Sequence, residues 1–247
     1  MPHGNIKAII LAGGLGTRFH PYTELIPKPM IPLGPDEKPV LEYIIKWISK
    51  YGIRKFVFLV NYRWKYIHNY FNNRSRFNVE ITYSIDEKAG YGNTGGAILK
   101  AYRNGLLSER ILIWYGDILA PIDIDDLVDY HVRRRADLTI VVTRRYKVPV
   151  GVAKYDENFR VIDFQEKPEL DINAAVGIAV METRVFDNNI ESFLGKNFDF
   201  MGDFVPWMLK TSHNVLAYVY NGEWYDMGSL AQYKKLNMDK IVLFFHS

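Results

Sequence analysis

The chain has 247 residues, of which 48% are hydrophobic and 24% charged, and its formal net charge is +3. This length and composition suit one globular domain with a sizeable core, and the small charge does not favour binding to nucleic acid or to an anionic membrane. The absence of cysteine excludes disulfides, thiolate zinc sites and cysteine nucleophiles. The sequence shows no secretory signal and no apolar run near the roughly 18 residues that span a bilayer, so we expect a cytoplasmic protein.

The first predicted element is a buried strand that leads into a glycine loop. An isoleucine-rich run covers residues 6–11, and Gly13, Gly14 and Gly16 follow it. A loop with so few side chains lets backbone N–H groups approach an anion closely. The stretch therefore predicts a cradle for a polyphosphate.

Two cationic side chains in the same region strengthen this prediction. Arg18 carries a planar fork that suits phosphate oxygens, and Lys28 carries a compact charge on a flexible stem. Two better-known glycine loops do not fit. In the dinucleotide-binding fingerprint G-x-G-x-x-G, Phe19 stands at the position of the last glycine, and the Gly-Lys-Ser/Thr of a Walker A motif is absent from the sequence.

Helical and strand patterns alternate through the first part of the chain. We predict helices at 39–50, 64–71, 94–102 and 123–134, between strands at 6–11, 56–60, 79–83, 111–115 and 138–143. This order predicts an α/β fold with a Rossmann-like, mostly parallel sheet that helices cover on both faces.

After about residue 145 the pattern becomes more antiparallel. We predict strands at 151–155, 161–165, 174–181 and 215–220, and helices at 185–194, 204–210 and 230–241. No linker rich in Gly, Pro or Ser separates the two parts, so we expect residues 1–247 to form a single domain.

Two aspartates lie beside glycines at the ends of apolar segments. Asp117 follows the strand at 111–115, where ligands bind in parallel α/β sheets, and Asp226 lies in Trp224-Tyr-Asp-Met-Gly228. By themselves such aspartates are more often turn or cap residues than ligands. Their oxygens are nevertheless of the kind that Mg²⁺ prefers.

The stretch Leu11–Pro32 resembles, nearly residue for residue, the signature of the sugar-1-phosphate nucleotidyltransferases, also called NDP-sugar pyrophosphorylases. The resemblance extends from about residue 6 to residue 236 and includes the Gly-Asp and Trp-x-Asp-x-Gly patterns. It implies transfer of a nucleotidyl group from an NTP to a sugar 1-phosphate, with an NDP-sugar and pyrophosphate as products. Residues up to about 145 then form a nucleotide-binding part, and residues from about 146 to 247 form the smaller, antiparallel sugar-binding part.

The resemblance also implies roles for individual residues. Arg18 and Lys28 are the expected catalytic residues, and Asp117 and Asp226 are the expected Mg²⁺ ligands. The sugar phosphate is expected at Gly151, Glu166 and Lys167, the last two within a Glu-Lys-Pro motif. The nucleotide is expected to contact a larger set, namely Leu11, Ala12, Gly13, Gly14, Gly16, Thr17 and Gly96.

The sequence departs from the family pattern at two places. Asn93 replaces a glycine beside the expected base, and because Asn tolerates positive φ we expect it to keep the turn. Ala175 replaces an asparagine before a sugar-facing strand. The base, the sugar and the state of self-association therefore stay open.

Two other functions stay open as well. The Asp123-x-Asp125 pattern is found in glycosyltransferases that use a nucleotide-sugar, although an aspartate before a helix is ordinarily a cap. The second alternative is a non-catalytic paralogue that binds a nucleotide-sugar and regulates a partner.

Overall fold

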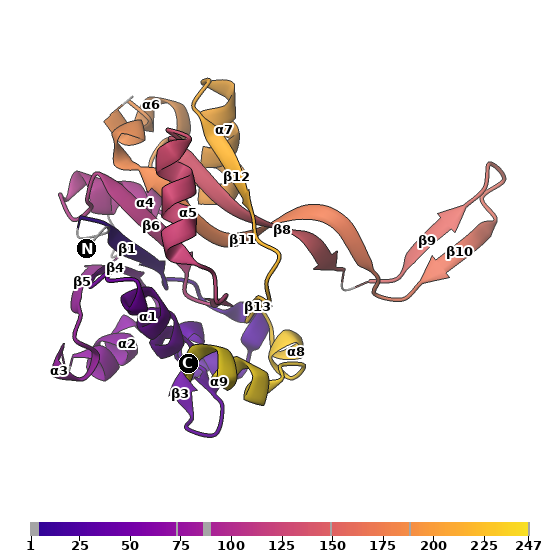
Figure 1. The fold of residues 1–247 in the computed structure, drawn as a ribbon, viewed down its shortest axis with the longest axis horizontal. Helices are drawn as coiled ribbons and strands as arrows, with labels where there is room; N and C mark the ends of the chain where they lie inside the picture. The colour runs from indigo at the N-terminus through magenta and orange to yellow at the C-terminus, as the bar shows by residue number, and fades with distance from the viewer. Residues whose placement is uncertain (1–4, 73, 86–89, 149, 188, 247) are drawn as a thin grey trace.

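The computed structural model describes residues 5–72, 74–85, 90–148, 150–187 and 189–246. Its centre is a seven-stranded sheet in the order β12-β8-β11-β6-β1-β4-β5 (Figure 1). Strand β11 runs antiparallel to its neighbours β6 and β8, and the other strands run parallel to one another, which confirms the predicted α/β class. The strands are β1 (Lys7–Leu11), β4 (Lys55–Val60), β5 (Glu80–Ile85), β6 (Arg110–Tyr115), β8 (Leu138–Lys147), β11 (Glu169–Glu182) and β12 (Val215–Val219).

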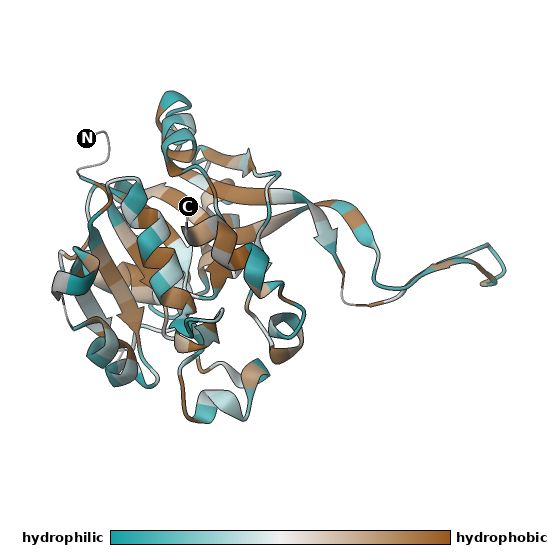
Figure 2. Ribbon diagram, turned by 60° about the horizontal axis from the view of Figure 1, so that its bottom comes forward, coloured by the Kyte–Doolittle hydropathy of each residue, from teal (hydrophilic) through white to brown (hydrophobic). Residues whose placement is uncertain are grey.

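Helices cover both faces of this sheet, as alternate side chains of the interior strand β1 show. In β1, Ala8 and Ile10 pack into one hydrophobic cluster and Ile9 packs into the other. The first cluster includes residues of α1 (Val40–Lys50), α2 (Trp64–Phe71), α3 (Arg74–Phe77), α5 (Ile124–Arg133) and α9 (Met238–His246). The second includes residues of α4 (Asn93–Arg103) and α7 (Val205–Lys210), with α6 (Glu191–Leu194) beside them. Figure 2 shows the apolar strands between the more polar helices.

Shorter elements complete the chain. Three small antiparallel pairs join β2 (Pro32–Leu33) to β3 (Lys38–Pro39), β7 (Ile118–Leu119) to β13 (Tyr225–Asp226), and β9 (Val152–Tyr155) to β10 (Val161–Gln165). The helical turns are Thr17–Phe19, Tyr22–Glu24, Lys28–Met30, Thr183–Asp187, Phe200–Phe204 and α8 (Leu230–Tyr233). Among the described residues, no helix is long and apolar enough to cross a membrane.

The long strands β8 and β11 continue beyond the body of the molecule and carry the β9–β10 hairpin away from it (Figure 1). We call residues 150–167, from the start of the hairpin to its return into β11, the β-ribbon. The predicted strands at 138–143 and 174–181 were therefore too short, since β8 continues to Lys147 and β11 already begins at Glu169.

Two predicted helices are wrong. The helix expected at 185–194 is a 3₁₀ turn followed by the single-turn α6, and Asn189, with φ of 48°, interrupts the helical path. Asn188 of this segment lies outside the described residues. The helix expected at 230–241 is divided into α8 and α9, because the Asn237 side chain accepts a hydrogen bond from the Lys240 N–H and so caps a new helix.

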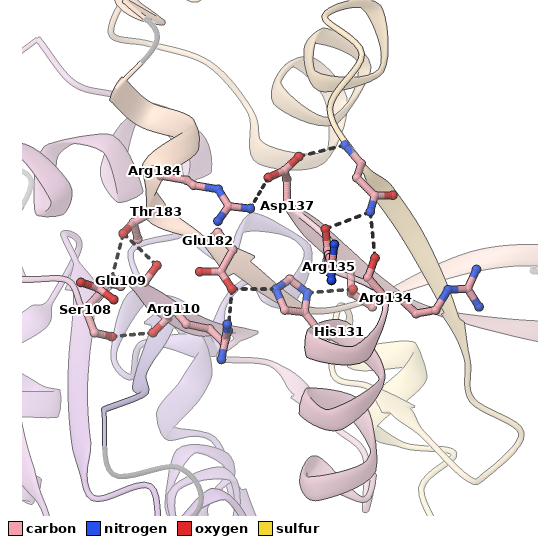
Figure 3. A network of polar contacts seen from close by, with 12 residues as sticks. Ser108, Glu109, Arg110, His131, Arg134, Arg135, Asp137, Glu182, Thr183 and Arg184 are labelled. Carbon is pink, nitrogen blue, oxygen red and sulfur yellow. Dashed lines mark hydrogen bonds and ion pairs between the residues drawn. The ribbon is translucent and has the colours of Figure 1, made fainter.

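A polar network fixes the sheet at the edge where the parallel strands begin (Figure 3). Glu182, the last residue of β11, accepts a 2.6 Å hydrogen bond from Arg110 Nε and lies 3.3 Å from His131 Nε2. The other ring nitrogen of His131 is 2.8 Å from Thr139 Oγ1. Burial opposes ionisation of Glu182, but the bonds from His131 and Arg110 outweigh it and lower the pKa of this carboxyl group. The network lies at the opposite edge of the sheet from the site described next.

Candidate active site

The main cavity of the described structure opens at the carboxyl ends of β1, β4 and β6 and encloses about 700 Å³. Gly13 and Gly14 follow β1, Asn61 follows β4 and Asp117 follows β6, so neighbouring parallel strands deliver them to one edge. The rest of the lining comes from the loop after β1 and from the segment at residues 90–97 before and within α4. The cavity is large enough for a nucleotide.

The glycine loop is held by specific contacts rather than by its own backbone alone. Gly16 has φ of 66°, and a Cβ there would lie 2.7 Å from a methyl carbon of Thr23, so glycine is required at this position. Thr23 Oγ1 donates a 2.9 Å hydrogen bond back to the Gly16 carbonyl. Phe19, which excluded the dinucleotide fingerprint, is buried with its ring 6.0 Å from that of Tyr233. The loop is therefore anchored through Thr23 and Phe19.

Charges of opposite sign meet on the cavity wall. The Lys28 ammonium donates to the Asp117 carboxylate in a partly buried ion pair. Asp226 lies on the adjacent strand, because Asp226 pairs with Ile118 in the β7–β13 ladder and the Met227 N–H donates to the Asp117 carbonyl at 2.8 Å. The Asp226 carboxylate also accepts a 3.2 Å hydrogen bond from Gln232 Nε2.

Asp117 and Asp226 are a donor set that fits Mg²⁺. Asp117, directly before β7, and Asp226, on the paired strand β13, both supply hard carboxylate oxygens. Mg²⁺ usually takes one or two protein carboxylates together with water and phosphate oxygens. Within the described part of the chain, no three His, Cys, Asp or Glu side chains form a metal-binding group. A metal here would consequently depend on the phosphates of a ligand for much of its coordination.

The cavity wall also includes a hydrogen-bonded pair that joins Tyr115, at the end of β6, to Thr94 in the first turn of α4. Burial raises the pKa of Tyr115 to about 12, so its hydroxyl stays protonated at neutral pH, and it hydrogen-bonds with Thr94. Thr94 Oγ1 lies 2.8 Å from Asp199 Oδ2 and accepts from the Phe200 N–H. Asn93, with φ of 53°, adopts the left-handed turn that we predicted for it.

The structure brings many of the predicted site residues together. Those that line the cavity are Leu11, Ala12, Gly13, Gly14, Gly16, Thr17, Arg18, Lys28 and Asp117. Gly228 of the Trp-x-Asp-x-Gly motif also lines it, which brings Asp226 to its edge. Among the described residues, no hydrogen bond or ion pair engages Arg18, so its guanidinium is available to a ligand.

Gly96 is not among the residues that line the cavity. It is buried against residues 196–198, where its N–H donates to the Phe198 carbonyl at 3.1 Å. A Cβ at Gly96 would lie 2.2 Å from the Lys196 carbonyl oxygen. This glycine is therefore needed for the close packing of α4 against a neighbouring segment.

The predicted sugar-phosphate residues lie in the β-ribbon, outside the cavity lining. Lys167 Nζ lies 2.8 Å from Glu166 Oε1, and both side chains are exposed. Gly151 lies beside them, since a Cβ there would lie 3.0 Å from the Glu166 carboxylate and 2.5 Å from the Phe164 ring. The three residues thus form one group at the base of the ribbon.

Sequence reasoning missed several residues of the cavity wall. Asn61 and Tyr115 each stand at the carboxyl end of a buried parallel strand, a position that the strand predictions already indicated. Tyr91 belongs to a segment without regular structure before α4, and no sequence pattern marked it.

The Asp123-x-Asp125 pattern is accounted for by helix capping. Asp123 is the N-cap of α5, and its carboxylate accepts a 3.0 Å hydrogen bond from the Asp126 N–H. Neither Asp123 nor Asp125 lines the cavity. This location gives no support to the glycosyltransferase alternative.

Comparison with known proteins agrees with this geometry. Residues 7–241 match the family model described as nucleotidyl transferase. The chain belongs to this family. The family predicted from the glycine loop and the two aspartate motifs is therefore confirmed.

Two curated relatives cover most of the chain. A UTP–glucose-1-phosphate uridylyltransferase from Synechocystis sp. is 31% identical over 92% of this chain, although the chain spans only 61% of that relative's length. A D-glycero-alpha-D-manno-heptose 1-phosphate guanylyltransferase from Aneurinibacillus thermoaerophilus is 36% identical to this chain, in an alignment that covers 81% of this chain and 84% of the relative's length.

The fold has a counterpart among solved structures. HddC from Yersinia pseudotuberculosis, complexed with GMP-PN, superimposes on this structure with a TM-score of 0.72. The superposition covers 93% of this chain and 97% of the HddC chain, and the two sequences are 23% identical. At that identity the likeness establishes the fold.

Proposed function

We propose that this protein transfers a nucleotidyl group from an NTP to a sugar 1-phosphate, giving an NDP-sugar and pyrophosphate. A phosphate oxygen of the sugar 1-phosphate attacks the α-phosphorus and forms a new P–O bond. The bond from the α-phosphorus to the β-phosphate oxygen breaks, and pyrophosphate leaves with the electron pair. Catalysis of such a step depends mainly on positioning and on charge neutralisation.

Each group in the cavity has a part in this proposal. The backbone of the loop at Gly13, Gly14 and Gly16 binds the triphosphate together with Arg18, and Leu11, Ala12 and Thr17 line its way to the base. Lys28 leaves Asp117 when the nucleotide enters and neutralises charge at the α-phosphate.

Asp117 and Asp226 are the residues that would hold Mg²⁺ in this proposal. A bound Mg²⁺ supplies charge neutralisation between the phosphate groups of the two substrates. Loss of the Lys28 ion pair would leave the Asp117 carboxylate available for that role.

The acceptor is assigned to the β-ribbon. In this proposal Lys167 binds the phosphate of the sugar 1-phosphate, Glu166 accepts hydrogen bonds from sugar hydroxyls, and Gly151 contacts the sugar beside Glu166. The cytoplasmic location expected from the sequence stays a prediction.

The observation that supports this function most strongly is the Lys28–Asp117 pair, with Asp226 on the adjacent strand, at the end of a glycine-loop cavity. The test is pyrophosphate release with Mg²⁺ over a grid of ATP, GTP, UTP, CTP and dTTP against glucose, mannose and heptose 1-phosphates. The grid includes several bases and sugars because the names of the curated relatives include both uridylyl and guanylyl transfer.

Release that needs both substrates is the expected result, and the fastest pair identifies the base and the sugar. Release of a nucleoside diphosphate from an NDP-sugar without pyrophosphate formation would favour the glycosyltransferase. No turnover together with binding of an NDP-sugar would favour the non-catalytic paralogue.

A further inference from the structure

A small pocket lies between α1 and α3, on the side of the molecule away from the β-ribbon (Figure 1). We call it the α1–α3 pocket, and it encloses about 240 Å³. Arg54 of its lining directly precedes β4, whereas Asn61 of the main cavity directly follows that strand. The six residues of β4 separate the two by about 20 Å, so the α1–α3 pocket is a separate site. Its polar lining consists of one serine and four cations, namely Ser49, Lys46, Lys50, Arg54 and Arg76.

The fold brings these positive charges together around one buried carboxylate. Lys46 and Lys50 are four residues apart on α1 and therefore share one face of the helix. Glu42, which is 1% exposed, lies 2.7 Å from Lys46 Nζ and 3.1 Å from Arg76 Nη2. Burial opposes ionisation of Glu42, but hydrogen bonds from Lys46 and Tyr70 outweigh it and lower the pKa of this carboxyl group. Glu42 thus holds two of the cations in place, and the described lining contains no further carboxylate.

Two of the lining groups have no partner of their own. Ser49 is 6% exposed, and its Oγ is buried with no hydrogen-bond partner among the described residues. A serine in a helix can donate to the carbonyl four residues earlier, but Ser49 does not. Within the described part of the chain, no hydrogen bond or ion pair engages the Arg54 guanidinium. A buried hydroxyl that lacks a partner costs free energy, which an acceptor in the pocket would recover.

We propose that the α1–α3 pocket binds a phosphate group, either as inorganic phosphate or as part of a phosphomonoester. Ser49 Oγ and the guanidinium groups of Arg54 and Arg76 donate hydrogen bonds to the phosphate oxygens, and Lys46 neutralises charge. The bond from Arg76 Nη2 to Glu42 leaves the rest of that guanidinium for the ligand.

The size and the donors of the pocket favour a phosphate group over other anions. A phosphate dianion offers more acceptor oxygens and one more negative charge than a carboxylate does. The volume lies below the roughly 300 Å³ at which pockets for whole drug-sized ligands begin, so it suits one phosphate group better than a nucleotide. The proposal is independent of the proposed function, because none of its residues lines the main cavity.

The test is calorimetric titration of inorganic phosphate into the full chain at constant ionic strength. We expect saturable binding to the wild type, and affinity about tenfold lower or less in Ser49→Ala and in Arg54→Gln, the scale of losing one hydrogen bond to a charged group. Without phosphate, Ser49→Ala should unfold at the same temperature as the wild type or at a higher one, since the hydroxyl has no partner to lose.

Lys55→Gln is the matched control, because Lys55 is the exposed neighbour of Arg54 and lies outside the pocket lining. It removes the same charge as Arg54→Gln and should leave the affinity for phosphate unchanged. Equal weakening by the two variants would show general attraction to positive charge and would overturn the proposal.

Arg18→Ala separates this pocket from the main cavity, which also attracts phosphate. We expect Arg18→Ala to keep the binding that Ser49→Ala weakens, and the reverse result would overturn the proposal. A parallel titration with glycerol 3-phosphate identifies the source, since tighter binding than inorganic phosphate indicates a phosphomonoester and weaker binding indicates the free ion. Absence of saturable binding for both probes would also overturn the proposal.

Discussion

Lys28 and Asp117, which lie 89 positions apart in the sequence, form an ion pair at the wall of the main cavity. The Lys28 side chain is only 11% exposed and that of Asp117 is 22% exposed, so the pair is shielded from much of the solvent. Two charges that a ligand can separate are suited to a site where a polyanion and a cation bind together, since each charge then gains a new partner.

Replacement of Lys28 by alanine should remove the charge neutralisation at the α-phosphate. We expect Lys28→Ala to lower kcat about 100-fold or more, on the scale of losing one preorganised electrostatic contact. Lys28→Arg keeps the charge and should retain more turnover than the alanine variant. Steady-state pyrophosphate release measures both, and thermal unfolding checks that each variant is folded. Full turnover by Lys28→Ala would contradict the assigned role.

Replacement of Asp226 by asparagine should weaken the binding of Mg²⁺. We expect Asp226→Asn to raise the Mg²⁺ concentration for half-maximal rate by about tenfold or more, because loss of a ligand costs at least as much as loss of an outer contact. Calorimetric titration of Mg²⁺ into the protein with bound NTP should show the same weakening without depending on turnover.

Asp123→Asn is the matched control for that experiment. Asparagine caps a helix as well as aspartate does, so the bond to the Asp126 N–H is kept and stability should change little. Turnover should be unchanged. Loss of turnover in Asp123→Asn, with Asp226→Asn active, would reverse the assignment in favour of the Asp-x-Asp pattern.

Two glycines of the predicted nucleotide site should behave differently when a methyl group is added. A Cβ at Gly96 would meet a backbone carbonyl at 2.2 Å, so Gly96→Ala should destabilise the fold by about 2 kcal/mol, as overpacking does. A Cβ at Gly14 would meet nothing within 4 Å, so Gly14→Ala should leave stability unchanged and raise KM for the NTP. Denaturant unfolding and steady-state kinetics separate the effects, and the reverse pattern would show that Gly96 is the ligand contact.

The grouping of residues around the main cavity could be predicted from the sequence because these residues follow strands directly. A buried parallel strand fixes where its carboxyl end lies, so Gly13, Gly14 and Asp117 converge once the strands are recognised. Gly96 shows the limit of this reasoning, since a motif does not reveal whether a glycine faces a ligand or another backbone segment.

The acceptor side could be predicted only as a set of residues. Gly151 and Glu166 are neighbours in space, but their position relative to the cavity depends on how far β8 and β11 extend beyond the body. Alternation of side chains indicates a strand without indicating where it leaves the core. The interruption at Asn189 was missed for a related reason, because a single residue with positive φ outweighs the helical spacing around it.

Glu182 offers a prediction about stability and pH that is independent of the active site. Its pKa is lowered in the folded state, so its ionised form contributes stability that is fully present above the ordinary value of 4.5 and is lost as the pH falls through the lowered value. Glu182→Gln should therefore lower the free energy of unfolding by about 3 kcal/mol at pH 7, because Arg110 and His131 lose a buried partner. The difference from the wild type should shrink below pH 4.5.

Glu191→Gln is the comparison for this experiment. Glu191 pairs with Arg103 at 3.1 Å, but both side chains are partly exposed, and such surface pairs contribute at most about 1 kcal/mol. Urea unfolding of both variants between pH 3 and pH 7 measures the two effects. A Glu182→Gln difference that stays constant across this range would show that packing, rather than the charge of Glu182, holds the end of β11 to β6 and α5.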